Sequence, residues 1–307
     1  GQSIPDALAN ILVAGNFIGT DGTDTGGDES GLLANGFLGI SITDGAMQST
    51  VGGDTPADRN LIVSSSNTAG IGIDGAATGS SVILNNYIGT NREGTHLRAT
   101  MEAIVINGSS GNQVRGNVIG GIEFGIEIYR DVQNTAITGN HIGVGTSGLP
   151  ITGLAGSTHG ILVTDGSGAT QGPQQTTIGG NEASMDGNII AFWNGNGVKI
   201  LRANASVASL RRHLITGNSI HSNGGLGIEL MDRAGVGAGP GPAPAAINDG
   251  IAFPLMTSAT SSMAGTEAST PGMAIGATEP GLMAPELPAL QPLPGASRST
   301  STTAAPR

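Results

Sequence analysis

One short phrase recurs along most of the chain and limits the folds open to it. Residues 137–143 read ITGNHIG, and six variants of this phrase occur elsewhere. They are VRGNVIG (114–120), LITGNSI (214–220), ILNNYIG (83–89), AGNFIG (14–19), DGNII (186–190) and DRNLI (58–62). Self-similarity at a period of tens of residues is typical of repeat architectures, in which each unit buries its apolar face against its neighbours.

A second phrase, Gly-Ile-x-Ile or a close variant, alternates with the first. It begins at residues 39, 70, 103, 125, 160, 197 and 227, at spacings of 22 to 37 residues. Apolar residues at a period of two predict strands with one buried face. The shortest interval, 103–125, has room for the strands AIVI, NQVRG and NVIGG and contains no helix pattern. Three strands and a Gly-Asn bend per unit predict a parallel β-helix.

We therefore predict an all-β fold, a right-handed, single-stranded parallel β-helix (a solenoid) of about seven turns within residues 1–231. Right-handedness follows from the strong preference of parallel crossover connections. Two inward columns are expected to hold Ile40, Ile42, Ile71, Ile73, Ile104, Ile106, Ile126, Ile128, Ile161, Val163, Val198 and Ile200. Eleven of the 15 prolines lie beyond residue 232. Residues 232–307 are therefore predicted to be a Pro/Ala/Gly/Ser/Thr-rich linker or disordered tail.

The asparagine of the first phrase is expected at a corner of each turn, where stacked side-chain amides would hydrogen-bond along a column. Asparagine also tolerates the left-handed backbone region better than most residues. We assign a structural role to this column rather than ligand binding. Its predicted members are Asn16, Asn86, Asn117, Asn140, Asn188 and Asn218.

The wording Asn-x-Ile-Gly-Thr followed by Gly-Ile-x-Ile, over about residues 10–231, resembles secreted bacterial right-handed parallel β-helix proteins of the pectate-lyase-like superfamily. The stretches GLGIELMD (225–232) and INDGIAFPLMTSAT (247–260) look like the exit segment of such proteins. After Thr260, no alternating strand pattern follows, where those proteins often carry a β-sandwich. The resemblance implies an extracellular or cell-surface location. It also implies that an enzyme of this shape would be a polysaccharide lyase, hydrolase or epimerase.

The composition excludes several classes of partner. With 23 acidic and 12 basic residues, the net charge is −11, which disfavours nucleic acid and anionic membranes. No apolar run is long enough for insertion into a membrane. The absence of cysteine excludes a disulfide scaffold or a thiolate metal site. Long polyanionic ligands are disfavoured for the same electrostatic reason, so a neutral or sparsely charged polysaccharide is the expected partner.

Three insertions follow the same corner, at Thr20–Asn35, Thr90–Glu102 and Gly143–His159, and are expected to wall the sheet formed by the second phrase. Binding in repeat proteins is usually found on a face that carries loops. Aromatic rings beside polar groups suit sugar rings and hydroxyls. The predicted carbohydrate-binding residues on this face are Phe124, Glu127, Tyr129, His159, Trp193 and Lys199. The alternative is that they are ordinary outward side chains, with Lys199 and Glu229 forming a weak surface pair.

Catalytic candidates are fewer. Hydrolases need two flanking carboxylates, and Val105 and Leu162 occupy the positions directly beside Glu127 one turn away. Glu127, His159 and Lys199 remain candidates for acid–base chemistry. The acidic loop TDGTDTGGDES offers Asp21, Asp24, Asp28 and Glu29 as candidate Ca²⁺ ligands, although its spacing matches no known calcium loop. A solvated acidic loop is the favoured interpretation, and no cofactor is required.

The favoured hypothesis is a secreted or cell-surface module that displays loops and binds polysaccharide without catalysis. The alternatives are a polysaccharide lyase, hydrolase or epimerase acting on the loop-flanked sheet, and a purely structural spacer. Binding and product assays on a polysaccharide panel separate these three hypotheses.

Overall fold

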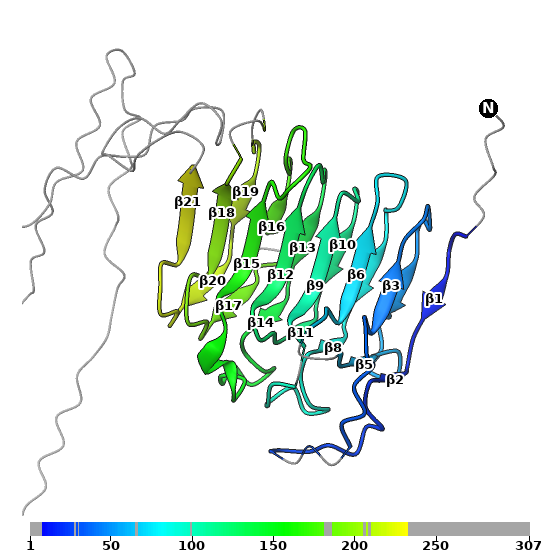
Figure 1. The fold of residues 1–307 in the computed structure, drawn as a ribbon. Helices are drawn as coiled ribbons and strands as arrows, with labels where there is room; N and C mark the ends of the chain where they lie inside the picture. The colour runs from blue at the N-terminus through cyan, green and yellow to red at the C-terminus, as the bar shows by residue number, and fades with distance from the viewer. Residues whose placement is uncertain are drawn as a thin grey trace, which may run out of the picture. The chain divides into compact units, whose positions relative to one another are not determined.

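The computed structural model describes residues 8–232, except residues 28, 30, 65–66, 99, 181–185, 205–206 and 208–209. In this part of the chain, 21 strands form three parallel sheets of seven strands each (Figure 1). Every third strand joins the same sheet, which is the order expected for a solenoid with three strands per turn. The predicted parallel β-helix of about seven turns is confirmed.

The three sheets are numbered here by their position in the repeat. Sheet 1 contains β3 (Ile40–Ile42), β6 (Ile71–Asp74), β9 (Glu102–Asn107), β12 (Phe124–Tyr129), β15 (His159–Thr164), β18 (Val198–Arg202) and β21 (Ile228–Asp232). Sheet 2 contains β1 (Leu12–Val13), β4 (Thr50–Gly52), β7 (Val82–Leu84), β10 (Gln113–Arg115), β13 (Ala136–Thr138), β16 (Thr177–Gly179) and β19 (Leu214–Thr216). Sheet 3 contains β2 (Phe17–Ile18), β5 (Leu61–Ile62), β8 (Tyr87–Ile88), β11 (Val118–Ile119), β14 (His141–Ile142), β17 (Ile189–Ala191) and β20 (Ser219–His221). A 3-10 helix, η1 (Leu154–Gly156), lies in the third insertion.

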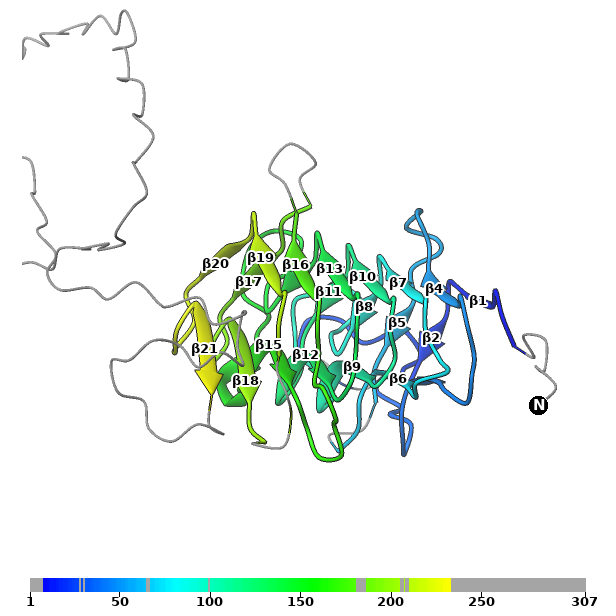
Figure 2. The same cartoon turned by 90° about the horizontal axis from the view of Figure 1, so that it is seen from above.

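The chain rises along sheet 1 at the front of Figure 1, passes behind it into sheet 2, and returns through sheet 3. It advances from β3 towards β21 as it does so, which is a right-handed path. Figure 2 shows sheets 1 and 2 on opposite sides of the solenoid. The shortest turn consists of β9, β10 and β11, as the 22-residue interval predicted. The predicted tail, residues 233–307, lies outside the described residues.

The predicted apolar columns line the interior. The inward residues of the four central strands of sheet 1 are fully buried: Ile71, Ile73, Ile104, Ile106, Ile126, Ile128, Ile161 and Val163. Ile40 is only half-buried, because β3 is the edge strand of the sheet. Each fully buried side chain of this size contributes about 1.5–3 kcal/mol. Stacking of turns is therefore the main source of stability, since one turn alone leaves its column exposed.

The asparagines form a continuous ladder of seven residues: Asn16, Asn60, Asn86, Asn117, Asn140, Asn188 and Asn218. At every step, the backbone N–H and the Nδ2 of one asparagine donate to the Oδ1 of the next. For Asn117 and Asn140 these distances are 2.9 and 3.0 Å. The predicted column is confirmed, and it includes Asn60. A buried polar column is compatible with the core because its groups are paired.

At five of the seven ladder positions, all except Asn60 and Asn188, the residue before the asparagine has a left-handed backbone. Gly116 and Gly139 have φ of 67° and 63°, and Asn85 has φ of 56°. The expectation that the ladder asparagines themselves adopt this conformation is wrong. The sharp reversal needs positive φ, which glycine adopts without a Cβ penalty. The following asparagine is then free to align its amide with the next turn.

The three insertions leave the same edge of the stack and pair with one another. Each begins with an antiparallel bridge, at Thr20–Leu32, Thr90–Leu97 and Val144–Pro150. The backbone N–H of Leu97 donates to the carbonyl of Thr152 at 2.8 Å, which joins the second insertion to the third. The N–H of Gly26 donates to the Glu93 carboxylate at 2.8 Å, which joins the first to the second.

Candidate functional site

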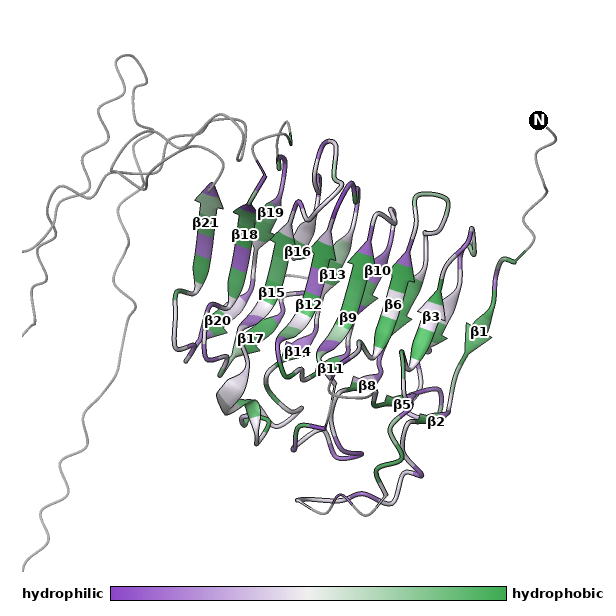
Figure 3. Cartoon of the chain, viewed as in Figure 1, coloured by the Kyte–Doolittle hydropathy of each residue, from purple (hydrophilic) through white to green (hydrophobic). Residues whose placement is uncertain are grey.

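The predicted binding residues other than Trp193 lie on two separate stretches of sheet 1. Glu127 on β12 pairs in register with Leu162 on β15, and Leu162 pairs with Lys199 on β18. Two turns, or about 9.6 Å, therefore separate Glu127 from Lys199. Figure 3 shows hydrophilic segments on β12 and on β18 and β21, with the more apolar β15 between them. We call these the groove half (β3 to β12) and the paired half (β15 to β21).

In the paired half, the polar groups bind one another. Lys199 Nζ lies 2.7 Å from the Glu229 carboxylate, and the Asn196 amide donates to the same oxygen at 2.6 Å. The backbone N–H of Asn196 donates to His159 Nδ1 at 3.0 Å. Burial, then the Lys199 charge, lowers the pKa of His159, which stabilises a neutral, accepting imidazole. Phe124 stacks on His159 with ring centroids 6.0 Å apart. The predicted Lys199–Glu229 pair is confirmed.

Trp193 does not lie on the binding face, which corrects the prediction that it stacks on sugar rings. Its side chain is 1% exposed and belongs to the hydrophobic core. The indole occupies space left by three glycines, because a Cβ on Gly125, Gly143 or Gly160 would approach it within 3.0, 2.6 and 3.2 Å. The ring therefore contributes to packing between sheets 1 and 3.

The groove half contains a hollow of about 430 Å³, within the size range of small-ligand pockets. Gly72 is one of its lining residues, in register with Ser41 on one side and Val105 on the other, and contributes no side chain. The lining residues that carry chemistry are Phe37, Asp74, Glu102, Asn107, Glu127 and Tyr129. Apart from Glu102, no described residue of the three insertions lines this hollow, so these loops do not form its wall as predicted.

The carboxylates of the groove interact although they are not directly opposite in register. Burial, followed by the charges of Glu102 and Glu123, raises the pKa of Glu127 to about 7. Burial and then Glu123 likewise raise the pKa of Glu102. Burial and the Glu127 charge raise the pKa of Tyr129, against the opposing effect of Arg130. Glu127 therefore carries a proton for part of the time near neutral pH, which is unusual for a carboxyl group.

Asn107 carries an unsatisfied polar atom beside these carboxylates. Its side chain is 8% exposed, and its Nδ2 donates to the Asp74 carboxylate. Its Oδ1 is buried and has no hydrogen-bond partner. Turning the amide over would place Oδ1 against the carboxylate, which is repulsive. A buried amide oxygen without a donor, on a residue that lines a hollow, calls for a hydrogen-bond partner from outside the chain.

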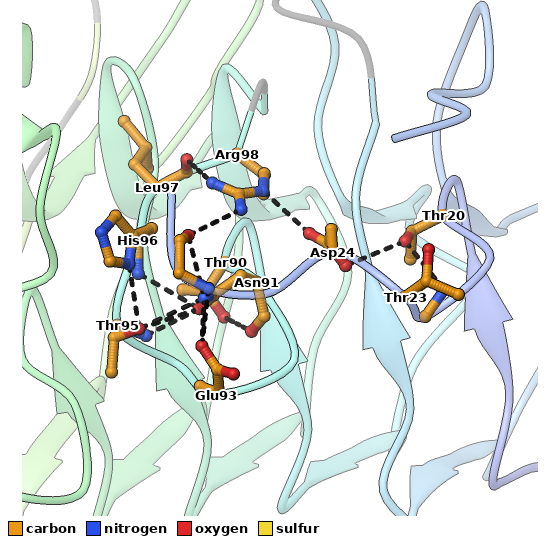
Figure 4. A network of polar contacts seen from close by, with 12 residues as sticks. Thr20, Thr23, Asp24, Thr90, Asn91, Glu93, Thr95, His96, Leu97 and Arg98 are labelled. Atoms are coloured by element: carbon orange, nitrogen blue, oxygen red, sulfur yellow. Dashed lines mark hydrogen bonds and ion pairs between the residues drawn. The ribbon is translucent and has the colours of Figure 1, made fainter. Parts of the chain in front are cut away.

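The acidic loop is held by internal contacts (Figure 4). Asp24 is fully buried, and its carboxylate binds Arg98 Nε at 2.8 Å and the Thr20 hydroxyl at 3.2 Å. Both oxygens are occupied, which corrects the assignment of Asp24 as a Ca²⁺ ligand. Asp21 accepts hydrogen bonds from the hydroxyl and N–H of Thr23, which lower its pKa.

The other two candidate ligands do not complete a metal site. Glu29 is exposed, and Asp28 lies outside the described residues. Within residues 8–232, as described, no three His, Cys, Asp or Glu side chains are grouped closely enough to hold a metal ion. Instead, the ion pair of Asp24 and Arg98 joins the first insertion to the second. Each of these buried charges requires a partner, and each is the partner of the other.

Sequence reasoning missed Glu102, Glu123, Asn107 and Phe37 as site residues. It compared Glu127 only with the residues directly opposite it, Val105 and Leu162, whereas the interacting carboxylates lie at the beginning of β9 and just before β12. The available signal was the pair of glutamates Glu102 and Glu123, each close to the start of a sheet 1 strand.

Comparisons with known proteins assign no family to this chain. No protein-family model matches the chain, and no curated protein or solved structure matches it. In the described part of the chain, no helix has the length and apolar character needed to cross a bilayer. The function must therefore be argued from the site itself.

Proposed function

We propose that this protein is a non-catalytic carbohydrate-binding β-helix module and that its groove half binds a polysaccharide chain. The observation that carries the proposal is the hollow of the groove half, which is lined by both hydrogen-bonding groups and aromatic rings. Tyr129 and the 69% exposed Phe37 provide ring faces for sugar C–H groups. Glu102, Glu127 and Asp74 accept hydrogen bonds from hydroxyl groups. Such a binder would work outside the cell or at its surface.

The paired half is a less suitable surface for the same ligand. His159, Asn196, Lys199 and Glu229 already bind one another. A sugar would have to break these contacts before making its own, and the gain would be small. This moves the proposed binding site from the fourth to sixth turns, where the sequence suggested it, to the first to fourth turns.

A block of the groove tests the proposal. Gly72 has no positive φ, so valine fits its backbone, and valine already occupies the neighbouring register position at Val105. A Cβ at Gly72 would lie 3.0 Å from the flexible end of Leu38. We expect Gly72→Val to weaken binding at least about thirtyfold while the thermal midpoint changes by less than about 2 °C. A panel of neutral, anionic and amino polysaccharides, titrated by calorimetry, identifies the ligand.

The matched control is Gln113→Ala, which changes an exposed residue of β10 on sheet 2, in the same turn as β9. It should bind like the wild type. Tyr129→Ala should lose about tenfold or more in affinity through the lost ring contact. Equal binding by Gly72→Val and the wild type would show that the ligand lies elsewhere, and no binding to any member of the panel would favour a structural spacer.

The raised pKa of Glu127 favours one second candidate, an enzyme that cleaves or modifies polysaccharide. A carboxyl group with a pKa of about 7 is suited to general acid catalysis near neutral pH. Incubating the panel with wild type and Glu127→Gln, and assaying reducing and unsaturated ends, separates the two functions. Products formed by the wild type and lost in the variant would replace binding with catalysis as the function.

A further inference from the structure

The groove carries negative charge without a basic counterpart. Asp74, Glu102 and Glu127 line it, and none of its lining residues is Lys, Arg or His. Lys199, the basic residue of the same sheet face two turns beyond Glu127, is bound to Glu229. Arg130 lies with its guanidinium carbon 5.5 Å from the Tyr129 ring centroid and donates to the Ser167 carbonyl. Among the described residues that line the groove, no cation accompanies these carboxylates.

The carboxylates are spread over the groove rather than gathered around one point. Asp74 is on β6, Glu102 on β9 and Glu127 on β12, which belong to successive turns. In register, Asp74 lies opposite Asn107, five residues along β9 from Glu102. Glu127 lies opposite Val105, three residues from Glu102. Among the residues that the structure describes, no three His, Cys, Asp or Glu side chains are grouped closely enough to hold a metal ion. This arrangement suits a ligand with positive charges along a chain better than a single bare cation.

The buried Oδ1 of Asn107 is an independent indication of the missing group. It is an acceptor without a donor, in the same row as Asp74 and Tyr129, which flank it in register on β6 and β12. A primary ammonium offers three N–H donors and no acceptor. It can therefore bind a carboxylate and an amide oxygen together. A hydroxyl group has one donor only and brings no charge to the carboxylates.

We propose that the groove selects sugar chains bearing free, protonated amino groups, such as oligomers of 2-amino-2-deoxyglucose, over neutral and uronate chains. This inference rests on the proposed polysaccharide binding and names its ligand class. The ammonium groups contact Asp74, Glu102 and Glu127, and one of them donates to Asn107 Oδ1. Tyr129 packs against a sugar ring and adds a cation–π contribution where an ammonium lies over its face.

Matched oligosaccharides test the inference with few other variables. A glucosamine hexamer and cellohexaose share the β-1,4-linked glucose backbone and differ at C2, where one carries an ammonium and the other a hydroxyl. The N-acetylated hexamer removes the charge from the same nitrogen, and a galacturonate hexamer reverses it. Spermine serves as a cation without sugar rings. Titrations are made at about pH 6.5, below the ordinary α-amino range, so that a substantial fraction of the amines is protonated.

We expect the glucosamine hexamer to bind at least about tenfold more tightly than cellohexaose and the N-acetylated hexamer, and the galacturonate hexamer to bind weakest. The advantage over cellohexaose should shrink at about 0.5 M salt, because exposed charges are screened. The double variant Glu102→Gln/Glu127→Gln should bind the glucosamine hexamer and cellohexaose equally. Glu229→Gln, on the same sheet but outside the groove, should keep the preference.

Equal affinity for cellohexaose and the glucosamine hexamer would overturn the inference while leaving polysaccharide binding intact. No binding to any of the four sugars would overturn both proposals. Spermine binding as tightly as the glucosamine hexamer, and displacing it, would show that the groove recognises amines without regard to the sugar. A preference that survives in Glu102→Gln/Glu127→Gln would place the charge recognition outside this groove.

Discussion

The groove half and the paired half of sheet 1 are built from the same repeat and carry similar residue types, yet they differ in what is left unpaired. In the paired half, Lys199, Glu229 and Asn196 satisfy one another. In the groove half, Glu102 and Glu127 face like charge, and Asn107 Oδ1 has no partner. Binding potential on a repeat surface therefore follows from unsatisfied groups and the space beside them, not from polar composition alone.

The largest effect we expect concerns the ladder that supports both halves. Asn140→Ala would leave the N–H of Asn117 and the carbonyl of Val114 without these partners. We expect a loss of about 2–4 kcal/mol in the free energy of unfolding, through lost hydrogen bonds rather than backbone strain. Denaturant unfolding measures it. A change below about 0.5 kcal/mol would show that the ladder contributes little to the stability of either half.

The second largest effect that we expect is that of Glu127→Gln on the pH dependence of the free energy of unfolding. The folded-state pKa of Glu127 is raised to about 7 from 4.5, so the folded protein holds a proton that the unfolded chain has lost between these values. The contribution of this raised pKa to the free energy of unfolding is fully present below about pH 4.5 and is lost as the pH rises through about 7.

The uncharged glutamine avoids this cost. Glu127→Gln should therefore be more stable than the wild type by about 1–3 kcal/mol at pH 8 and equal to it at pH 4. Denaturant unfolding at both pH values checks this. A variant less stable than the wild type at pH 8 would mean that the Glu127 carboxylate has a favourable partner and that the two halves do not differ as described.

The smallest effect should come from Glu229→Gln in the paired half, which we expect to destabilise the protein, whereas Glu127→Gln stabilises it. Burial raises the pKa of Glu229, but the hydrogen bond and charge of Lys199 outweigh this and lower it overall. The pair therefore stabilises above about pH 4.5, and its contribution falls as the carboxylate is protonated. Glu229→Gln should cost about 0.2–1 kcal/mol at pH 7 and less at pH 3, measured by the same unfolding experiment. A gain in stability at pH 7 would contradict the pairing.

The sequence predicted the scaffold far better than the site. Inward columns such as Ile104 and Ile106 were predictable because a parallel stack requires the same periodic positions in every turn. The Glu102–Glu127 interaction was not, since it acts between neighbouring strands at positions three residues apart in register. The position of Trp193 depended on space left by glycines in neighbouring turns, which the local pattern around residue 193 does not reveal.

The most direct test of the difference between the two halves is an NMR titration of the glutamate side-chain carboxyl carbons, with and without the glucosamine hexamer. In the free protein, Glu127 should titrate near pH 7 and Glu229 below the ordinary glutamate value. Added hexamer should shift the signals of Glu127 and Glu102 and lower the apparent pKa of Glu127, because an ammonium favours the carboxylate. Glu229 should not change. Ligand-induced shifts at Glu229 and none at Glu127 would contradict the account.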